Sequence, residues 1–263
     1  MTHELTKQQE RILSLIAQYR FLNRVQIQTL LGHKLPELVN IWLKDLTDKA
    51  YLGRIYSPAI GERNKPSVYF IKLAGIQAIR RTATYPPEHL RKLYREAERS
   101  MSFVSKCQFI ADLCLGLRQK SLGHNEDFPL YEAFTASDLT LSTLEVLSGL
   151  QPDLVLRRRK ENQPDKYSVI LILDPATTSA IIRSRLNGFL RLYRGGDWES
   201  QFEEPFPTLL VACPTTSMLI AAKRLSRYTL EKAGNPEDVL VRVATIGSIK
   251  DQGVTGKIWE LAT

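Results

Sequence analysis

The fold of the N-terminal part is decided by residues 23–46, which read NRVQIQTLLGHKLPELVNIWLKDL. Asn23 can cap a short helix, and Gly32 can end it, since glycine tolerates a positive φ. Pro36 suits the first turn of the next helix. The buried stripe of that next helix is predicted to be Val39, Trp42, Leu43 and Leu46. A short helix, a tight turn and a second helix with one apolar and one polar face predict a helix-turn-helix.

The flanking sequence extends this motif in both directions. Thr6 and Gln9 fit a capping box for an earlier helix from about Lys7 to Tyr19. Residues 51–56 and 67–71 read as two strands that form a hairpin, and a further helix ends near residue 81. The tip of the hairpin carries Arg63, Asn64 and Lys65. Residues 1–81 are therefore predicted to form a winged helix-turn-helix domain.

Charge is distributed unevenly along the chain. Residues 1–81 contain 13 Lys+Arg and 6 Asp+Glu, whereas residues 82–263 contain 23 and 22, so the surplus is +7 in the first segment and +1 in the second. A small basic unit on an otherwise neutral chain indicates a polyanionic partner, and double-stranded DNA is the natural one for this fold. Winged helices also serve as protein-docking modules, which is the alternative.

The expected DNA contacts divide into two groups. Lys34, Asn40 and Lys44 lie on or before the polar face of the second helix of the motif, which enters the major groove because that groove is wide enough for a helix. A second group is expected to hold the phosphate backbone or the minor groove. It consists of Arg54, Arg63, Asn64 and Lys65.

Residues 82–100 are predicted to be a boundary that contains a connector helix. A polar stretch with Pro86 and Pro87 disfavours helix, and residues 88–99 are highly charged and helical in pattern. A long amphipathic helix then runs from Met101 to about Arg118. These helices are candidates for a homodimer interface.

The second half of the chain has a different pattern. Apolar strand-like runs at residues 154–156, 167–173, 208–212 and 239–244 alternate with helical segments at 179–193 and 217–230. This alternation predicts an α/β sheet covered on both faces over residues 101–263, with a further edge strand near residues 257–261. The fold class is therefore mixed α/β.

The order of these elements is similar to the PD-(D/E)xK nuclease core. In that core a Pro-Asp carboxylate and an acidic residue two positions before a lysine hold a divalent metal. Here Pro152-Asp153 and Asp174 match the carboxylates, but Ala176 stands where the lysine belongs. We expect no catalytic residues, with Asp153 and Asp174 as degenerate candidates. The run Arg157, Arg158 and Arg159 is a candidate secondary phosphate contact.

Other chemistry is not indicated. The three cysteines form no CxxC pair or Cys/His cluster, and there is no Gly-rich phosphate loop, so we expect no metal and no cofactor. The N-terminus lacks a signal-peptide pattern, and no apolar run approaches the ~20 residues of a membrane span. We expect a cytoplasmic, nucleoid-associated protein without membrane partners.

The chain resembles the replication-relaxation family of plasmids and other mobile elements. The similarity lies in Leu5–Gln9 with Ile12-Leu13, Arg20–Leu22, Trp42–Leu46, Tyr51-Leu52, Tyr69–Gly75, Pro152–Leu156, Asp174 with Thr177 and Ser179, and Phe206–Val211 with Pro214-Thr215. The resemblance implies a winged-helix DNA-binding domain joined to a degenerate nuclease-like α/β domain, with a role in plasmid replication or DNA relaxation and its control.

The leading hypothesis is a sequence-specific DNA-binding protein of a mobile element that regulates transcription or replication. Two alternatives stay open. The first is a metal-dependent nuclease or nickase that uses Asp153 and Asp174. The second is an interaction module that recruits a DNA-processing protein partner.

Overall fold

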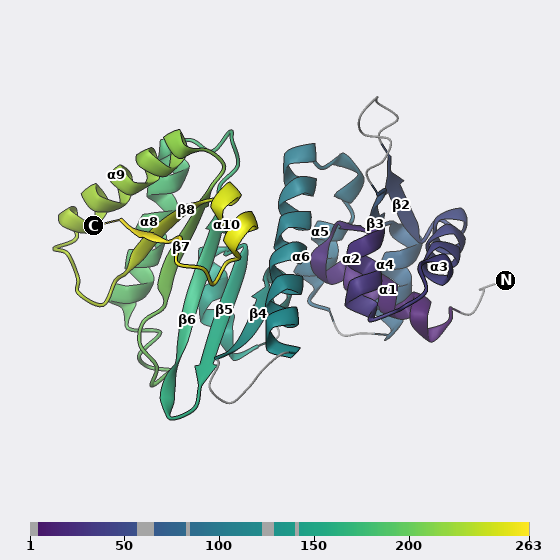
Figure 1. Ribbon diagram of the computed structural model, residues 1–263, viewed down its shortest axis with the longest axis horizontal. Coiled ribbons are helices and arrows are strands. Elements are labelled where there is room, and N and C mark those ends of the chain that lie inside the picture. The colour runs from purple at the N-terminus through teal and green to yellow at the C-terminus, as the bar shows by residue number, and fades with distance from the viewer. Residues whose placement is uncertain (1–4, 57–65, 83–84, 123–128, 140–141, 263) are drawn as a thin grey trace. The chain divides into compact units, whose positions relative to one another are not determined.

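The computed structural model describes residues 5–56, 66–82, 85–122, 129–139 and 142–262, and the chain divides into two compact units, Met1–Leu115 (unit 1) and Gly116–Thr263 (unit 2). Figure 1 shows the elements of both. No helix within the described residues is long and apolar enough to cross a membrane.

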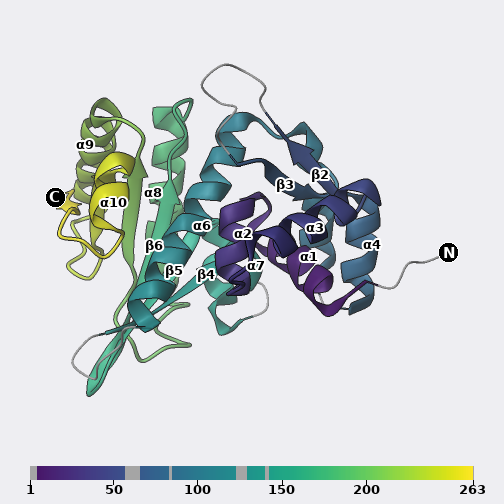
Figure 2. The ribbon, with the colours of Figure 1, turned by 45° about the vertical axis from the view of Figure 1, so that its right-hand side comes forward.

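Unit 1 begins with the elements of a winged helix. They are α1 (Lys7–Tyr19), β1 (Leu22–Asn23), α2 (Arg24–Leu31), α3 (Pro36–Asp48), β2 (Leu52–Ile55), β3 (Val68–Ile71) and α4 (Leu73–Thr82). The strands form an antiparallel sheet in the order β1-β3-β2, and α1 to α4 pack together (Figure 2). The predicted helices and hairpin strands are confirmed, and β1 is an addition, since a two-residue strand has no sequence pattern of its own.

Local sequence explains these boundaries. Thr6 and Gln9 make a reciprocal capping box at the start of α1, and Asn23 and Gln26 make another at the start of α2. Gly32 ends α2 with a φ of 66°. Between these signals, the buried residues of α1 are Gln9, Ile12, Leu13, Ile16 and Ala17, which recur at helical spacing.

Residues 85–115 belong to unit 1 rather than to a connector. They form α5 (Pro87–Leu93), a 3-10 turn η1 (Glu96–Glu98) and the first part of α6 (Met101–Leu122). The single helix expected over residues 88–99 is therefore interrupted, and the domain boundary lies at residue 115 instead of residue 100. The reason is burial, because Leu90 and Leu93 join the core of the winged helix and Glu96 is 1% exposed.

Unit 2 is a six-stranded mixed sheet in the order β4-β5-β6-β7-β8-β9. Its strands are β4 (Leu130–Thr135), β5 (Leu154–Lys160), β6 (Gln163–Ile172), β7 (Thr208–Cys213), β8 (Val241–Thr245) and β9 (Glu260–Leu261). The pairs β6-β7 and β7-β8 are parallel and the others antiparallel. The predicted strands and the edge strand β9 are confirmed.

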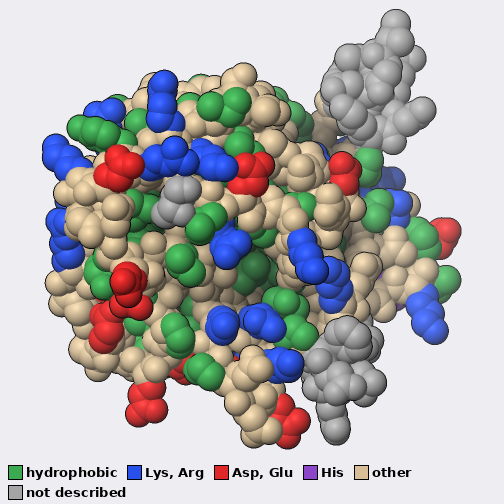
Figure 3. Space-filling model, turned by 60° about the vertical axis from the view of Figure 1, so that its left-hand side comes forward, with side chains coloured by type: hydrophobic (Ala, Val, Ile, Leu, Met, Phe, Trp, Pro, Cys, Tyr) green, Lys and Arg blue, Asp and Glu red, His purple; other side chains and the backbone are tan. Residues whose placement is uncertain are grey.

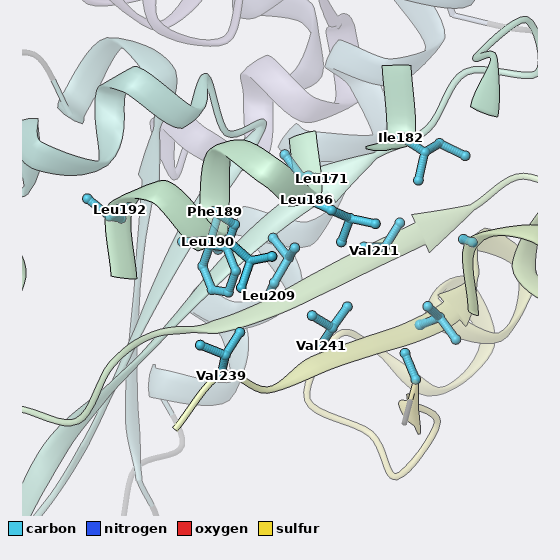
Figure 4. Close-up of a cluster of buried hydrophobic side chains, with 14 of the residues drawn as sticks. Leu171, Ile182, Leu186, Phe189, Leu190, Leu192, Leu209, Val211, Val239 and Val241 are labelled. Atoms are coloured by element: carbon cyan, nitrogen blue, oxygen red, sulfur yellow. The ribbon is translucent and has the colours of Figure 1, made fainter. Parts of the chain in front are cut away.

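Helices α8 (Ser179–Gly195) and α9 (Thr216–Lys232) cover one face of this sheet. Their apolar side chains meet those of β6, β7 and β8 in one core, where Phe189 lies against Leu209 and Val239 (Figure 4). Shorter elements complete the unit, namely α7 (Ala136–Leu139), η2 (Thr143–Leu150) and α10 (Ile246–Gln252). Neither these short helices nor β4 was predicted.

Candidate nucleic-acid interface

The turn between α2 and α3 sets where α3 begins. Gln28 Nε2 donates to the carbonyl of His33 at 3.2 Å, and the His33 ring meets the Trp42 ring edge-on with centroids 5.0 Å apart. Leu35 is the N-cap of α3 and makes no side-chain cap, so Pro36 starts the helix by its fixed φ. The turn therefore holds Lys34 at the entrance to α3 with its side chain exposed.

A buried amide anchors α3 to α1. Gln9 Nε2 donates to Asp45 Oδ2 at 2.7 Å, and Gln9 is only 6% exposed. Gln26 anchors α2 to α6 in the same way. Its Nε2 donates to Asp112 Oδ1 at 2.6 Å and to the carbonyl of Gln108 at 2.9 Å, both on α6. Both capping-box glutamines thus also fix the packing of their helices, which places the outer face of α3 on a rigid support.

The outer face of α3 carries polar and apolar side chains together. Asn40 and Lys44 are both exposed and lie one turn apart, as expected from their spacing. Ile41 between them is 59% exposed, and Leu38 is 37% exposed. Glu37 and Asp48 are also exposed, so this face is amphipathic and not uniformly basic.

Arg54 lies on β2 and is exposed. Its Nε donates to Ser67 Oγ on the other side of the hairpin at 2.8 Å, and its guanidinium lies 5.2 Å from the centre of the Tyr56 ring. The remaining wing candidates, Arg63, Asn64 and Lys65, lie outside the described residues.

Arg24 is a cation of this region that was not among the sequence predictions. Burial raises the pKa of the Tyr69 hydroxyl, and the positive charges of Arg54 and Arg24 act in the opposite direction. Arg24 reaches Tyr69 because β1 pairs with β3, with Leu22 opposite Tyr69. The strand β1 is too short to be read from sequence, so this neighbourhood could not be foreseen.

In unit 2 the two candidate catalytic carboxylates, Asp153 and Asp174, both accept hydrogen bonds from backbone amides. Asp153 Oδ2 accepts a hydrogen bond from the amide of Ile172 at 2.7 Å, which ties the start of β5 to the end of β6. Asp174 Oδ1 accepts from the amide of Ala176 at 2.8 Å in the turn after β6. Among the described residues, no group of three or more His, Cys, Asp or Glu side chains is placed to hold a metal ion.

The arginines of β5 do not form one patch. Arg157 and Arg159 both pair with Glu132 and with Asp165, and the Arg159 contacts are 3.4 and 3.3 Å. Arg158 alternates to the opposite face of the sheet, as successive strand residues do. Arg157, Arg158 and Arg159 therefore cannot all contact the same phosphate from one face of the sheet.

No protein-family model matches the chain, and no curated protein matches it. Among solved structures, a zinc-responsive MarR family member, ZitR from Lactococcus lactis, is similar at 18% identity over 46% of this chain and 78% of that chain, with a TM-score of 0.27. The resemblance to the replication-relaxation family accordingly stays a prediction.

Proposed function

We propose that unit 1 binds double-stranded DNA, with α3 in the major groove. The observation that carries this proposal is the rigidly supported outer face of α3, on which Asn40 and Lys44 stand exposed one turn apart. A recognition helix needs this combination, because base contacts lose specificity when the helix can shift on its scaffold.

Each side chain on this face suits a particular part of the groove. The Asn40 amide can donate to N7 and accept from N6 of adenine, and the Lys44 ammonium can reach guanine or a phosphate. Ile41 lies beside them on the exposed side of α3 and can contact a thymine methyl group. We propose that Lys34, at the entrance to α3, also reaches guanine or a backbone phosphate.

The charge of the chain supports the same unit. Residues 1–115 contain 18 Lys+Arg and 10 Asp+Glu, whereas residues 116–263 contain 18 of each. The whole net charge of +8 therefore lies on unit 1, which favours association with a polyanion through the release of counterions. Arg54 and Arg24, on β2 and α2, add cations beside Tyr69.

A regulatory role in transcription or replication on a mobile element is the function we propose for this binding. It is supported by the similarity of Trp42–Leu46, Tyr69–Gly75 and Pro152–Leu156 to the replication-relaxation family.

A protein-docking function is the second candidate. It is favoured by the exposed apolar side chains at the N-cap of α3 and on its outer face, where Leu35 is 55% and Ile41 59% exposed, together with the acidic Glu37. Such a face can pack against a partner helix or groove as well as against DNA.

The two candidates are separated by selecting bound sequences from a random DNA pool with the full chain and measuring their affinity at several salt concentrations. We expect Lys44→Ala to weaken binding and to lower the slope of log K against log salt by about one unit. Asn40→Ala should relax the sequence preference at one position.

Lys49→Ala is the matched control, because it removes the same charge five residues further along, at the C-cap of α3, from an ammonium that pairs with Asp45 at 2.9 Å. Equal losses in the Lys44 and Lys49 variants would show that α3 does not enter the groove. No affinity of the full chain for any DNA at low salt would favour the docking function.

A further inference from the structure

The face of the unit 2 sheet opposite α8 and α9 contains a basic cavity. Strand alternation places Arg158 of β5 and Lys166 of β6 on this face, where their Cα atoms are direct partners, and Tyr131 of β4 is the partner of Arg158 on the other side. Arg242 of β8 lies further across the same face, opposite Leu210 of β7.

The loop after α10 borders this row of side chains, and together they form a half-open cavity of about 450 Å³. Lys257 and Trp259 from this loop line it together with Tyr131, Arg158, Lys166 and Arg242. None of the described residues that line it is acidic. Among the described lining residues, four cations therefore share the cavity wall and no carboxylate accompanies them, an arrangement that favours an anion.

Arg158 supplies the second observation. Its Nε atom is buried and has no hydrogen-bond partner within the described part of the chain. A buried guanidinium nitrogen left unpaired costs free energy, which an anionic ligand in the cavity would recover. On the opposite face of the same strand, Arg157 and Arg159 both pair with Glu132 and Asp165, although the Nε of Arg157 is also buried without a hydrogen-bond partner among the described residues.

The aromatic side of the cavity is held in place. Trp259 Nε1 donates to the carbonyl of Val254 at 2.8 Å, and the Trp259 carbonyl accepts from Arg242 Nη1 at 3.4 Å. Lys120 Nζ donates to Thr255 Oγ1 at 2.7 Å and fixes the middle of the loop. A preorganised aromatic ring beside a fixed guanidinium suits a flat ring that carries a phosphate group.

On the face of the molecule seen in Figure 3, Lys and Arg side chains gather with hydrophobic ones across the middle, and Asp and Glu lie mostly toward the margins.

We propose that this cavity is a nucleotide-binding site. The phosphate lies against Arg158, Lys166, Arg242 and Lys257, and the base lies beside Tyr131 or Trp259. The volume is within the range of about 300–1,000 Å³ found for small-molecule sites. A free mononucleotide and the end of a single-stranded nucleic acid present the same chemistry to this site. The site is independent of the DNA-binding surface proposed for unit 1, because its residues all belong to unit 2.

The test is calorimetric titration of the full chain with AMP, inorganic phosphate, adenosine and a single-stranded dT8. AMP or dT8 should bind, and Arg158→Gln should weaken that binding at least tenfold. If AMP binds, the ligand is a free nucleotide. If dT8 binds and AMP does not, and Arg158→Gln weakens the binding of dT8, the ligand is the end of a single strand.

Arg159→Gln is the matched control, since it removes an equal charge from the next residue of β5 on the opposite face, and Arg191→Gln on α8 is a second. Both should leave the affinity unchanged. The proposal is overturned if neither AMP nor dT8 binds, if inorganic phosphate binds as tightly as AMP, or if Arg159→Gln weakens binding as much as Arg158→Gln. A loss on Lys257→Gln, in an exposed loop position, confirms the site without relying on a strand residue.

Discussion

Arg20 and Glu96, 76 residues apart, are joined by two hydrogen bonds from Arg20 Nε (2.8 Å) and Nη2 (2.5 Å) to the same oxygen of Glu96. Arg20 follows α1 with a φ of 70°, and the amide of Phe21 donates to the carbonyl of Tyr19, so the backbone makes a strained γ-turn there. The ion pair holds this turn against η1, and it joins the segment after α4 to the winged helix.

Removal of Arg20 should destabilise unit 1 strongly. The Glu96 side chain is fully buried, whereas the Arg20 side chain is 20% exposed. Arg20→Ala leaves a buried carboxylate without its main partner and should cost about 3 kcal/mol. Arg99→Ala, whose Nε is 4.0 Å from Glu96 and whose side chain is 33% exposed, should cost less than about 1 kcal/mol. Urea unfolding of both variants measures the difference, and equal costs would contradict it.

The same carboxylate should make stability depend on pH. Burial raises the pKa of Glu96 above its ordinary value of 4.5, and Arg20 and Arg99 offset this only in part. The folded state therefore holds the proton more tightly than the unfolded state. The stability from Glu96 is fully present below pH 4.5 and is lost as the pH rises through the raised folded pKa.

Glu96→Gln cannot ionise, so its free energy of unfolding should lack this decline. Urea titrations of both proteins from pH 4 upward should show the native protein losing stability relative to the variant. A constant difference between the two at every pH would show that Glu96 titrates alike in both states.

Gly53 cannot carry a side chain without displacing Phe70. A Cβ on Gly53 would lie 2.2 Å from the Phe70 ring, which is itself packed 5.9 Å from the Phe21 ring. Gly53→Ala should therefore destabilise the protein by about 1–3 kcal/mol through overpacking. Gly116→Ala, at an exposed position within α6, should stabilise by about 0.5–1 kcal/mol, because it reduces the backbone entropy of the unfolded chain. Thermal unfolding of the two variants should move in opposite directions.

The hairpin should contribute phosphate contacts. Arg54→Ala is expected to weaken DNA binding for all sequences alike and to lower the salt slope by about one unit. Arg63→Ala, in the segment outside the described residues, carries the same expectation. Arg11→Ala, on the exposed side of α1, removes an equal charge and should leave the slope unchanged. The slope of log K against log salt is measured for each variant by fluorescence anisotropy. If no hairpin variant changes this slope, the hairpin does not contact the DNA.

Local signals accounted for the winged-helix elements. The caps at Thr6 and Asn23, Gly32 and Pro36 placed the starts of three helices and the end of α2 as observed, because each signal acts within one turn of the chain. The exposure of Asn40 and Lys44 followed from the same helical period. The domain boundary was not accessible in this way, since the burial of Leu90, Leu93 and Glu96 depends on partners far away in the sequence.

The sequence by itself determined the helix-turn-helix, the alternating strands of the second half and the concentration of positive charge near the N-terminus. Hydrogen bonding to near neighbours and the period of apolar residues fix these features. Only the tertiary structure decided that Glu96 is paired with Arg20, and that Arg157 and Arg159 are paired with Glu132. Sheet pairing and packing choose the face and the partner of each side chain, and they act between residues that the linear chain does not bring together.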